Sequence, residues 1–338
     1  MTTLLVTGGA GFIGSNFIRY WFNEHREDHI INFDLLTYAG NRENLRDIED
    51  TQKNRYQFVH GDITDAKKVT QIFKKERPDI IVNFAAESHN SRGVLDPGLF
   101  FRTNILGTQV LLDAAYKCNV PRFHHISTCE VYGDLPLDSN KQFTEESPYR
   151  PRTPYNASKA GADMAVRAYY HTFGLPVTIS NCSNNYGPYQ FPEKVIPHFT
   201  ICALQGKPLP LYTNNRNKRE WLHVDDHCRA IDLILHKGKC GETYNVGSGI
   251  EADIETIADT VIATIGCNSD LKTYVEDRPG HDRRYLLDTS KIQTELGWKP
   301  SIAFQKGLKE AILWYKEHES WWKPLLTKLD INERIWTK

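Results

Sequence analysis

The sequence lacks the features that mark several classes of protein. Its seven cysteines are odd in number and none stands in a C-x-x-C spacing, which argues against a disulfide framework or a zinc site. No apolar run approaches the roughly 18 residues that a membrane span requires. The start, MTTLLV, has no basic segment and runs directly into glycines, unlike a signal peptide. We therefore expect a reduced, cytoplasmic protein with no membrane partner.

An excess of charge of one sign is also absent. The chain has 41 Lys and Arg residues against 42 Asp and Glu residues, so its formal net charge is −1. Such a balance gives no bulk attraction to nucleic acid or to anionic lipid. We expect no nucleic-acid partner.

What the chain does contain is an alternation of β-rich runs and helical patterns. The helical patterns include residues 15–25, 65–78 and 103–120, and β-rich runs separate them. Strands that alternate with helices predict an α/β fold with a doubly wound parallel sheet of the Rossmann type. The strands are expected at residues 3–7, 29–34, 56–62, 79–86, 122–128, 177–182 and 242–248.

A glycine-rich turn, TGGAGFIG, joins the first expected strand to the first helix. Its G-x-x-G-x-x-G spacing allows a tight turn and lets the backbone approach a pyrophosphate at the helix N-terminus. Asp34 ends the second strand, where a carboxylate accepts a hydrogen bond from a ribose 2′-hydroxyl and repels a 2′-phosphate. Turn and acid together predict NAD as the cofactor, rather than NADP. The predicted NAD contacts are Gly8, Gly11, Phe12, Ile13, Gly14, Asp34, Asp62, Ile63, Ala85, Tyr155 and Lys159.

The pattern of elements loosens beyond about residue 180. Glycine and proline become frequent there, as in NYGPYQFPEK and DRPGHDRRY. We predict an NAD-binding domain over residues 1–180, to which a segment at about 220–247 returns. Residues 181–338 are expected to form a smaller α/β lobe that binds the substrate.

Two residues of the segment PYNASK suggest a catalytic pair. Tyr155 and Lys159 stand four residues apart and so share one face of a helix. A lysine cation beside a phenol lowers the phenol pKa, so the phenolate can take a hydroxyl proton as hydride leaves the carbon. Thr128, at the end of the strand HHIST, is expected to hold the same hydroxyl, because Ser127 points to the opposite face.

With these motifs the chain resembles the extended short-chain dehydrogenase/reductases, and among them the nucleotide-sugar 4,6-dehydratases, especially those that act on dTDP-glucose. The resemblance runs from residue 4 to about residue 324 and includes TGGAGFIGSNF, NFAAESH, PYNASKA, NCSNNYGPYQFPEK and DRPGHDRRY. It implies a lyase of deoxysugar biosynthesis that uses NAD and a dTDP- or UDP-hexose. It also implies a homodimer, for which the helices at residues 102–118 and 156–173 are the candidates.

The resemblance implies a redox-neutral cycle on the hexose. Tyr155, helped by Lys159, removes the C4 hydroxyl proton while NAD takes the C4 hydride. The new ketone makes the C5 hydrogen acidic, and Glu130 takes that proton. An acid then protonates the C6 hydroxyl so that water leaves, and the hydride returns to C6 to give a 4-keto-6-deoxy sugar. The predicted catalytic residues are Thr128, Cys129, Glu130, Tyr155 and Lys159.

Two stretches depart from the pattern of the family. The dehydratases usually carry Asp, their acid for the C6 hydroxyl, where this chain has Cys129. A thiol is a poorer acid than a carboxyl group by roughly 4–5 pKa units. If the thiol merely replaces the carboxyl group, Cys129→Asp is expected to raise turnover. After AAESH the family usually continues Val-Asp-Arg-Ser, whereas residues 90–93 here are NSRG.

The departures leave more than one reaction open. A 4,6-dehydratase is the leading interpretation. The alternatives are a 5,6-dehydratase that leaves an exocyclic alkene, a UDP-glucuronate-type decarboxylase or epimerase, and a non-catalytic sugar-nucleotide binder. The presence of Tyr155, Lys159 and Glu130 argues against a binder, which has no use for a C5 base.

The resemblance also assigns the substrate side of the site. Asparagine and arginine side chains are expected to bond phosphate and sugar oxygens, because a guanidinium group binds phosphate in a bidentate manner. The segment HVDDH has the spacing of a metal site, but His223 and His227 are expected to cap and pack a helix, and no metal is predicted. The predicted substrate contacts are Ser88, His89, Asn184, Glu193, Lys194, Arg219, Asn245, Arg278 and His281.

Overall fold

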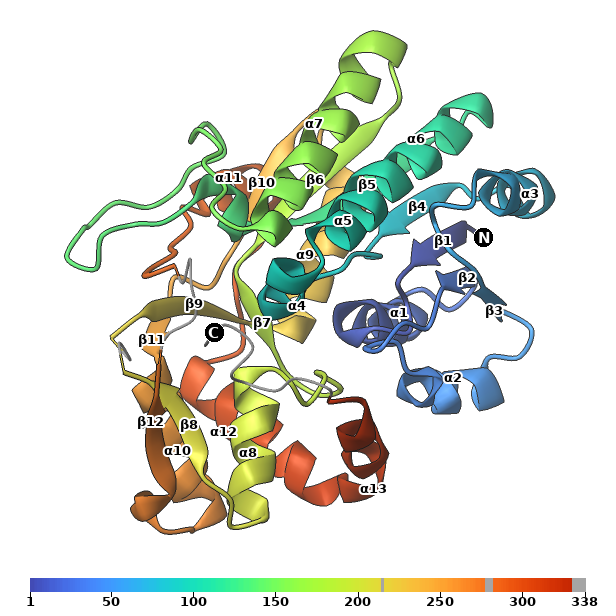
Figure 1. Ribbon diagram of the computed structural model, residues 1–338. Helices are drawn as coiled ribbons and strands as arrows, with labels where there is room; N and C mark the ends of the chain where they lie inside the picture. Colours follow the sequence, from blue (N-terminus) through green and yellow to red (C-terminus); the bar gives the residue numbers. More distant parts are fainter. Residues whose placement is uncertain (214–215, 277–281, 330–338) are drawn as a thin grey trace.

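A computed structural model describes residues 1–213, 216–276 and 282–329. Its main feature is a seven-stranded sheet in the order β10-β6-β5-β4-β1-β2-β3, in which all neighbouring strands run parallel (Figure 1). Every strand predicted from the sequence is part of it, so the doubly wound α/β fold is confirmed. The strands are β1 (Thr3–Thr7), β2 (His29–Asp34), β3 (Tyr56–His60), β4 (Ile80–Asn83), β5 (Arg122–Thr128), β6 (Val177–Cys182) and β10 (Thr243–Val246).

Helices cover both faces of this sheet. Leu4 and Val6 of β1 share one buried cluster with α1 and α9, whereas Leu5 shares another with α3, α6 and α7. Because helices cover both faces, the central strands β1 and β4 consist mostly of buried apolar residues. In the described residues no helix is both long enough and apolar enough to cross a membrane. The helices are α1 (Phe12–Glu24), α2 (Arg46–Thr51), α3 (Ala66–Glu76), α6 (Thr108–Lys117), α7 (Pro154–Phe173) and α9 (Val224–Lys237).

The expected single helix over residues 103–120 differs from the structure. After α4 (Asn90–Leu95) and α5 (Pro97–Phe100), residues 101–107 form a π-helical turn, η2 (Phe101–Gly107), which leads into α6. In this turn the Asn104 amide oxygen accepts from the backbone N–H of Glu87 at 2.8 Å, and its nitrogen donates to the Ser158 hydroxyl at 2.8 Å. The wide turn therefore ties the segment after β4 to α7.

The rest of the chain forms a smaller lobe below the carboxyl ends of the strands (Figure 1). It contains a three-stranded sheet, β11-β9-β7, and a two-stranded sheet, β12-β8. Helices α8, α10 and α12 pack around one apolar core with these strands. The elements of the lobe are β7 (Asn184–Tyr186), α8 (Val195–Leu204), β8 (Leu209–Tyr212), β9 (Lys218–His223), β11 (Glu251–Asp253), α10 (Ile254–Ile265), β12 (Lys272–Val275), α12 (Phe304–Glu317) and α13 (Glu319–Trp322), with short 3-10 turns at η4 (Ser269–Leu271) and η5 (Lys323–Lys328). Outside the lobe, α11 (Ser290–Leu296) packs against β10 and α9, and the 3-10 turns η1 (Arg42–Leu45) and η3 (Cys129–Tyr132) follow β2 and β5.

The chain passes between sheet and lobe several times. It leaves the large sheet after β6 to build β7, α8, β8 and β9, and it returns as α9 and β10. It then leaves again for β11, α10 and β12. The segment predicted to return at about 220–247 contains α9 and β10, which complete one edge of the sheet and part of its cover.

Candidate active site

A cavity of about 360 Å³ lies at the carboxyl ends of the strands. The order of the strands changes direction beside β1, which pairs with β2 on one side and β4 on the other. Ligands of open α/β sheets bind in the crevice at such a switch point. Every residue predicted to contact NAD lines this cavity.

The glycine turn brings backbone close to backbone at one end of the cavity. Gly8 has a φ of +68°, and a Cβ atom there would lie 2.6 Å from the backbone nitrogen of Ala85. A Cβ atom on Gly14 would collide with the carbonyl oxygen of Gly8. Helix α1 begins directly after Gly11 and has no side-chain cap, which leaves its first N–H groups to bind an anion. The turn therefore fits a pyrophosphate.

Asp34 is fixed at the cavity wall by backbone groups. Its carboxylate oxygens accept from the N–H of Ala10 at 2.9 Å and from the N–H of Leu36 at 2.7 Å. Burial raises the pKa of Asp34, and these two bonds oppose that rise. A carboxylate has further lone pairs, so Asp34 can still accept from ribose hydroxyls. A hydrogen-bond acceptor at this place in the cavity wall fits the ribose of NAD.

Four of the five predicted catalytic residues meet on another wall of the same cavity: Thr128, Glu130, Tyr155 and Lys159. Strand β5 ends at Thr128, whose hydroxyl accepts from the N–H of Glu130 at 3.3 Å and so begins the 3-10 turn η3. Helix α7 begins where Thr153 caps it, followed by Pro154 in the first turn. The strand end and the first two turns of α7 thus present these side chains to one space.

The surroundings of Tyr155 shift its pKa. Burial, followed by the nearby Glu130, holds this pKa well above its usual value, while a hydrogen bond with Thr128 lowers it. In the protein without NAD, desolvation is therefore the largest influence on the phenol pKa, and the predicted lowering by Lys159 stays a prediction.

Lys159 is embedded in a buried polar network beneath the cavity. Its ammonium group donates to the carbonyl of Ile126 at 2.5 Å and lies 3.2 Å from Nε2 of His125. Asp163, one turn further along α7, lies 3.5 Å from the same His125 nitrogen and accepts from Ser127 at 2.8 Å. Burial lowers the pKa of Lys159 to about 8, and the Asp163 carboxylate opposes this change. Burial raises the pKa of Asp163 to about 6.

Cys129 does not share the cavity with its neighbours. Its side chain is 1% exposed and belongs to a buried cluster of apolar and aromatic residues, among them Tyr132, Ala160 and Tyr285. Burial holds the pKa of the thiol well above its usual value. The only thiol among the described cavity-lining residues is that of Cys182, at the end of β6. The structure therefore provides no direct path from the Cys129 thiol to the cavity.

The second departure from the family pattern touches the predicted base. The amide nitrogen of Asn90 donates to Oε2 of Glu130 at 3.2 Å. Its amide oxygen accepts from the hydroxyl of Thr153 at 2.8 Å. Both departures from the family pattern are therefore next to Glu130. Asn90 is hydrogen-bonded to its side chain, and Cys129 precedes it in the sequence.

The predicted substrate contacts divide into groups. Ser88, Asn184, Glu193 and Lys194 line the cavity. His89 stands beside it, with Nδ1 3.3 Å from Oε1 of Glu193. Arg278 and His281 lie outside the described residues.

Two further predicted substrate contacts are occupied by protein groups. The guanidinium of Arg219 donates to the carbonyl of Asp282 at 2.7 Å and to that of Lys218 at 2.8 Å. The Asn245 amide donates to the carbonyl of Phe143 at 2.9 Å and accepts from the Tyr132 hydroxyl at 2.9 Å. Asn245 is fully buried in the structure, and its expected contact with the substrate stays a prediction.

Glu87 and Tyr38 are among the cavity residues that the sequence analysis did not name. Glu87 lines the wall next to Ser88, and burial raises its pKa. Tyr38 lines the wall near Asp34, and its hydroxyl donates to Glu193 at 2.8 Å. Glu87 lies in NFAAESH, one of the segments that carry the resemblance, so the sequence contained a signal for it.

The chain is similar in sequence and in fold to known proteins. Residues 5–311 match the family model described as GDP-mannose 4,6 dehydratase. The chain is 46% identical to a dTDP-glucose 4,6-dehydratase of Salmonella typhimurium over 94% of both chains. It is 48% identical to one of Mycobacterium tuberculosis over 95% of this chain and 96% of the relative. The crystal structure of DesIV, a dTDP-glucose 4,6-dehydratase from Streptomyces venezuelae with NAD and TYD bound, is 46% identical and superposes with a TM-score of 0.91 over 96% of this chain and 99% of that chain.

Proposed function

Because the chain belongs to the GDP-mannose 4,6-dehydratase family, we propose that it is an NAD-dependent hydro-lyase that converts a dTDP-linked hexose to its 4-keto-6-deoxy form. The observation that supports this most is that Tyr155, Lys159 and Glu130 share one cavity with the glycine turn. A phenol and a lysine suit an oxidation at C4, and a carboxylate beside them suits removal of the C5 proton.

Each residue has a defined task in this mechanism. The glycine turn and Asp34 would hold NAD, and bound NAD would supply an acceptor for the C4 hydride, its return to C6 and a positive charge in the site. Tyr155, hydrogen-bonded to Thr128, would act as a phenolate, favoured by the positive charges of Lys159 and bound NAD, and would take the proton of the C4 hydroxyl. Lys159, held by the carbonyl of Ile126, supplies positive charge beneath this phenol. Glu130 removes the C5 proton, and the carboxyl group so formed gives a proton to the C6 hydroxyl, which leaves as water. Asn90 holds this side chain in place.

The reaction can be separated from its alternatives by one incubation series. The purified protein is incubated with dTDP-glucose, UDP-glucose and UDP-GlcNAc. Loss of water with the alkaline absorbance of a 4-keto sugar supports the proposal. Loss of water without a ketone identifies a 5,6-dehydratase. The changed residues next to Glu130, Asn90 and Cys129, favour this alternative over the others. A product formed without loss of water contradicts dehydration. If none of the sugar nucleotides reacts, the protein is instead a sugar-nucleotide binder.

Removing the Cys129 thiol is expected to have little effect on turnover. The side chain lies in a buried cluster and does not line the cavity, so Cys129→Ala should keep kcat within about threefold and lose roughly 1 kcal/mol of stability. Steady-state kinetics and thermal unfolding measure the two quantities. A fall in kcat of more than about a hundredfold, the size of a lost general acid, would show that the thiol protonates the leaving hydroxyl.

The same burial changes what we expect of Cys129→Asp. A carboxylate in this cluster is desolvated among apolar side chains, which costs stability. We therefore expect a lower melting temperature instead of the higher turnover that the sequence alone suggested. Higher turnover at unchanged stability would show that residue 129 reaches the substrate.

The activity should depend on pH through Lys159. Its pKa of about 8 means that the ammonium charge is lost as the pH rises through that value, so kcat/KM should fall on the alkaline side. Because the Asp163 carboxylate raises this pKa, Asp163→Asn should move the alkaline limb to lower pH. A pH profile of both proteins measures the shift. A limb that stays in place in Asp163→Asn would mean that another group controls it.

We also propose that the protein is a homodimer that associates through η2, α6 and α7. These elements lie side by side at one end of the molecule (Figure 1). They carry large apolar side chains that are between 41% and 49% exposed: Phe101, Leu106, Tyr116, Met164 and Phe173. Apolar side chains gathered in this way suit contact with a second copy. Light scattering on the purified protein tests the proposal, and a monomeric mass contradicts it.

A further inference from the structure

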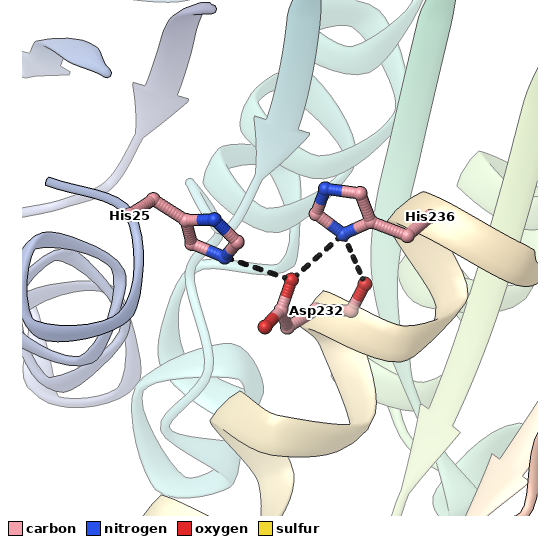
Figure 2. Close-up of side chains that lie close together, drawn as sticks. All are labelled: His25, Asp232 and His236. Carbon is pink, nitrogen blue, oxygen red and sulfur yellow. Dashed lines mark hydrogen bonds and ion pairs between the residues drawn. The ribbon is translucent and has the colours of Figure 1, made fainter. Parts of the chain in front are cut away.

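A compact cluster of possible metal ligands lies at the far end of α1 from the glycine turn. It consists of His25, which follows α1, and of Asp232 and His236, which stand four residues apart on α9 (Figure 2). Nε2 of His25 lies 3.1 Å from Oδ1 of Asp232, and Nδ1 of His236 lies 2.8 Å from the same oxygen. All three possible ligand atoms lie within 4.8 Å of one another.

Surrounding groups hold these side chains in place. The Tyr20 hydroxyl donates to the other carboxylate oxygen of Asp232 at 3.0 Å. The His25 ring stacks on Trp21 with 4.0 Å between ring centroids, and the Trp21 nitrogen donates to Asp28 at 3.1 Å. Outer contacts of this kind fix the direction of metal ligands. The cluster is therefore ordered although it joins segments about 200 residues apart in the chain.

The position and charge of the cluster also suit a cation. The His236 side chain is 49% exposed, whereas those of His25 and Asp232 are 24% and 16% exposed, so an ion can enter from solvent. The carboxylates of Asp28 and Glu24 lie near enough to interact electrostatically with His236 and Tyr20, respectively, and they add negative charge near the cluster. The carbonyl oxygen of Asp232, 3.0 Å from Nδ1 of His236, is a further oxygen within reach.

We propose that His25, Asp232 and His236 form a site for a divalent transition-metal ion of the Zn²⁺ class, which joins the end of α1 to α9. Zinc binds histidine nitrogen and carboxylate oxygen at about 2.0–2.2 Å, so ligand atoms around a tetrahedral ion lie about 3.3 Å apart. The contacts of Asp232 Oδ1 with His25, at 3.1 Å, and with His236, at 2.8 Å, must lengthen by only a few tenths of an ångström. The ligand nitrogens of His25 and His236 must approach each other. Two histidines and one carboxylate leave a position open for water. The ion displaces the protons shared between the three side chains.

The proposal concerns a structural ion, separate from the catalytic cavity. Helix α1 carries the glycine turn at its start and His25 after its end, and it packs against α9. An ion that holds the end of α1 against α9 would stabilise this pair of helices. It would leave the residues that line the cavity in place, so kcat should not depend on it.

The test uses the full chain with NAD bound, after treatment with a chelator. Titration with Zn²⁺ in a calorimeter should show one site of micromolar affinity in the parent protein. Asp232→Asn keeps the shape of the side chain but weakens a ligand, so it should lower the affinity at least about tenfold, as should His25→Ala. Zn²⁺ should raise the melting temperature of the parent and not that of Asp232→Asn.

A second probe and a matched control keep the result specific. Co²⁺ at this site should give visible ligand-field bands without the near-ultraviolet band of a thiolate ligand. His198→Ala removes a different histidine, which lies 3.8 Å from the thiol of Cys202, and should bind Zn²⁺ as the parent does. The proposal is overturned if Asp232→Asn and His25→Ala bind Zn²⁺ like the parent, if the parent binds none, or if the Co²⁺ spectrum shows thiolate ligation.

Discussion

Tyr155→Phe is expected to lower kcat by about a thousandfold. General acid–base groups contribute about 10²–10⁴-fold to rate, and without the phenolic oxygen nothing hydrogen-bonded to Thr128 accepts the C4 hydroxyl proton. The ring is half-buried and packs edge-to-face on Phe100, with 6.4 Å between ring centroids, a contact that phenylalanine keeps. The loss should therefore appear in kcat, with little change in nucleotide-sugar affinity or in melting temperature.

The kinetics of Tyr155→Phe are measured by stopped-flow absorbance of the reduced cofactor and by product mass. Tyr274→Phe serves as the control, because Tyr274 is an exposed tyrosine on β12, far in the chain from the site, and it should behave as the parent. If Tyr155→Phe oxidises C4 at the parental rate, another group takes the proton and the assignment of Tyr155 is wrong.

Glu130→Gln should separate the two halves of the reaction. The phenol, the lysine and the glycine turn are untouched, so C4 oxidation should proceed and reduced cofactor should accumulate to one equivalent per site. Elimination of water should slow by about 10²–10⁴-fold, because an amide cannot take the C5 proton. Glutamine keeps the size of the side chain, and the Asn90 amide can still donate to its oxygen.

This prediction also has a matched control. Glu146→Gln makes the same chemical change at an exposed position and should turn over normally. Two results contradict the assignment of Glu130: dehydration at the parental rate, or no reduction of the cofactor at all. The first would give the base role to another group, and the second would place Glu130 in the oxidation step.

Much of the fold could be predicted because its signals are local. Each strand of the large sheet is a short β-rich run, and the turn that ends in Gly14 has few conformations open to it. Asp34 was found because its distance along the chain from this turn is fixed by one helix and one strand. Tyr155 and Lys159 were predicted as a catalytic pair because they stand four residues apart, which places them on one face of α7.

What could not be predicted depends on contacts between distant segments. The π-helical turn η2 has the same apolar pattern as an α-helix, and only its bonds to Glu87 and Ser158 show what it stabilises. Cys129 stands beside two cavity residues in sequence, yet the 3-10 turn after β5 sends its side chain into the core. The guanidinium of Arg219 also donates to the carbonyl oxygens of Asp282 and Arg283, which are distant from it in the sequence.

The repeated crossing of the chain between sheet and lobe limits how the protein can be divided. A fragment that stops after β6 would lack β10, the neighbour of β6 at one sheet edge, and α9, which covers α1. Its edge strand would expose unpaired backbone groups, and the apolar side of α1 would face water. Neither part is therefore a self-sufficient module, and a domain exchange would have to transfer the large sheet and the smaller lobe together.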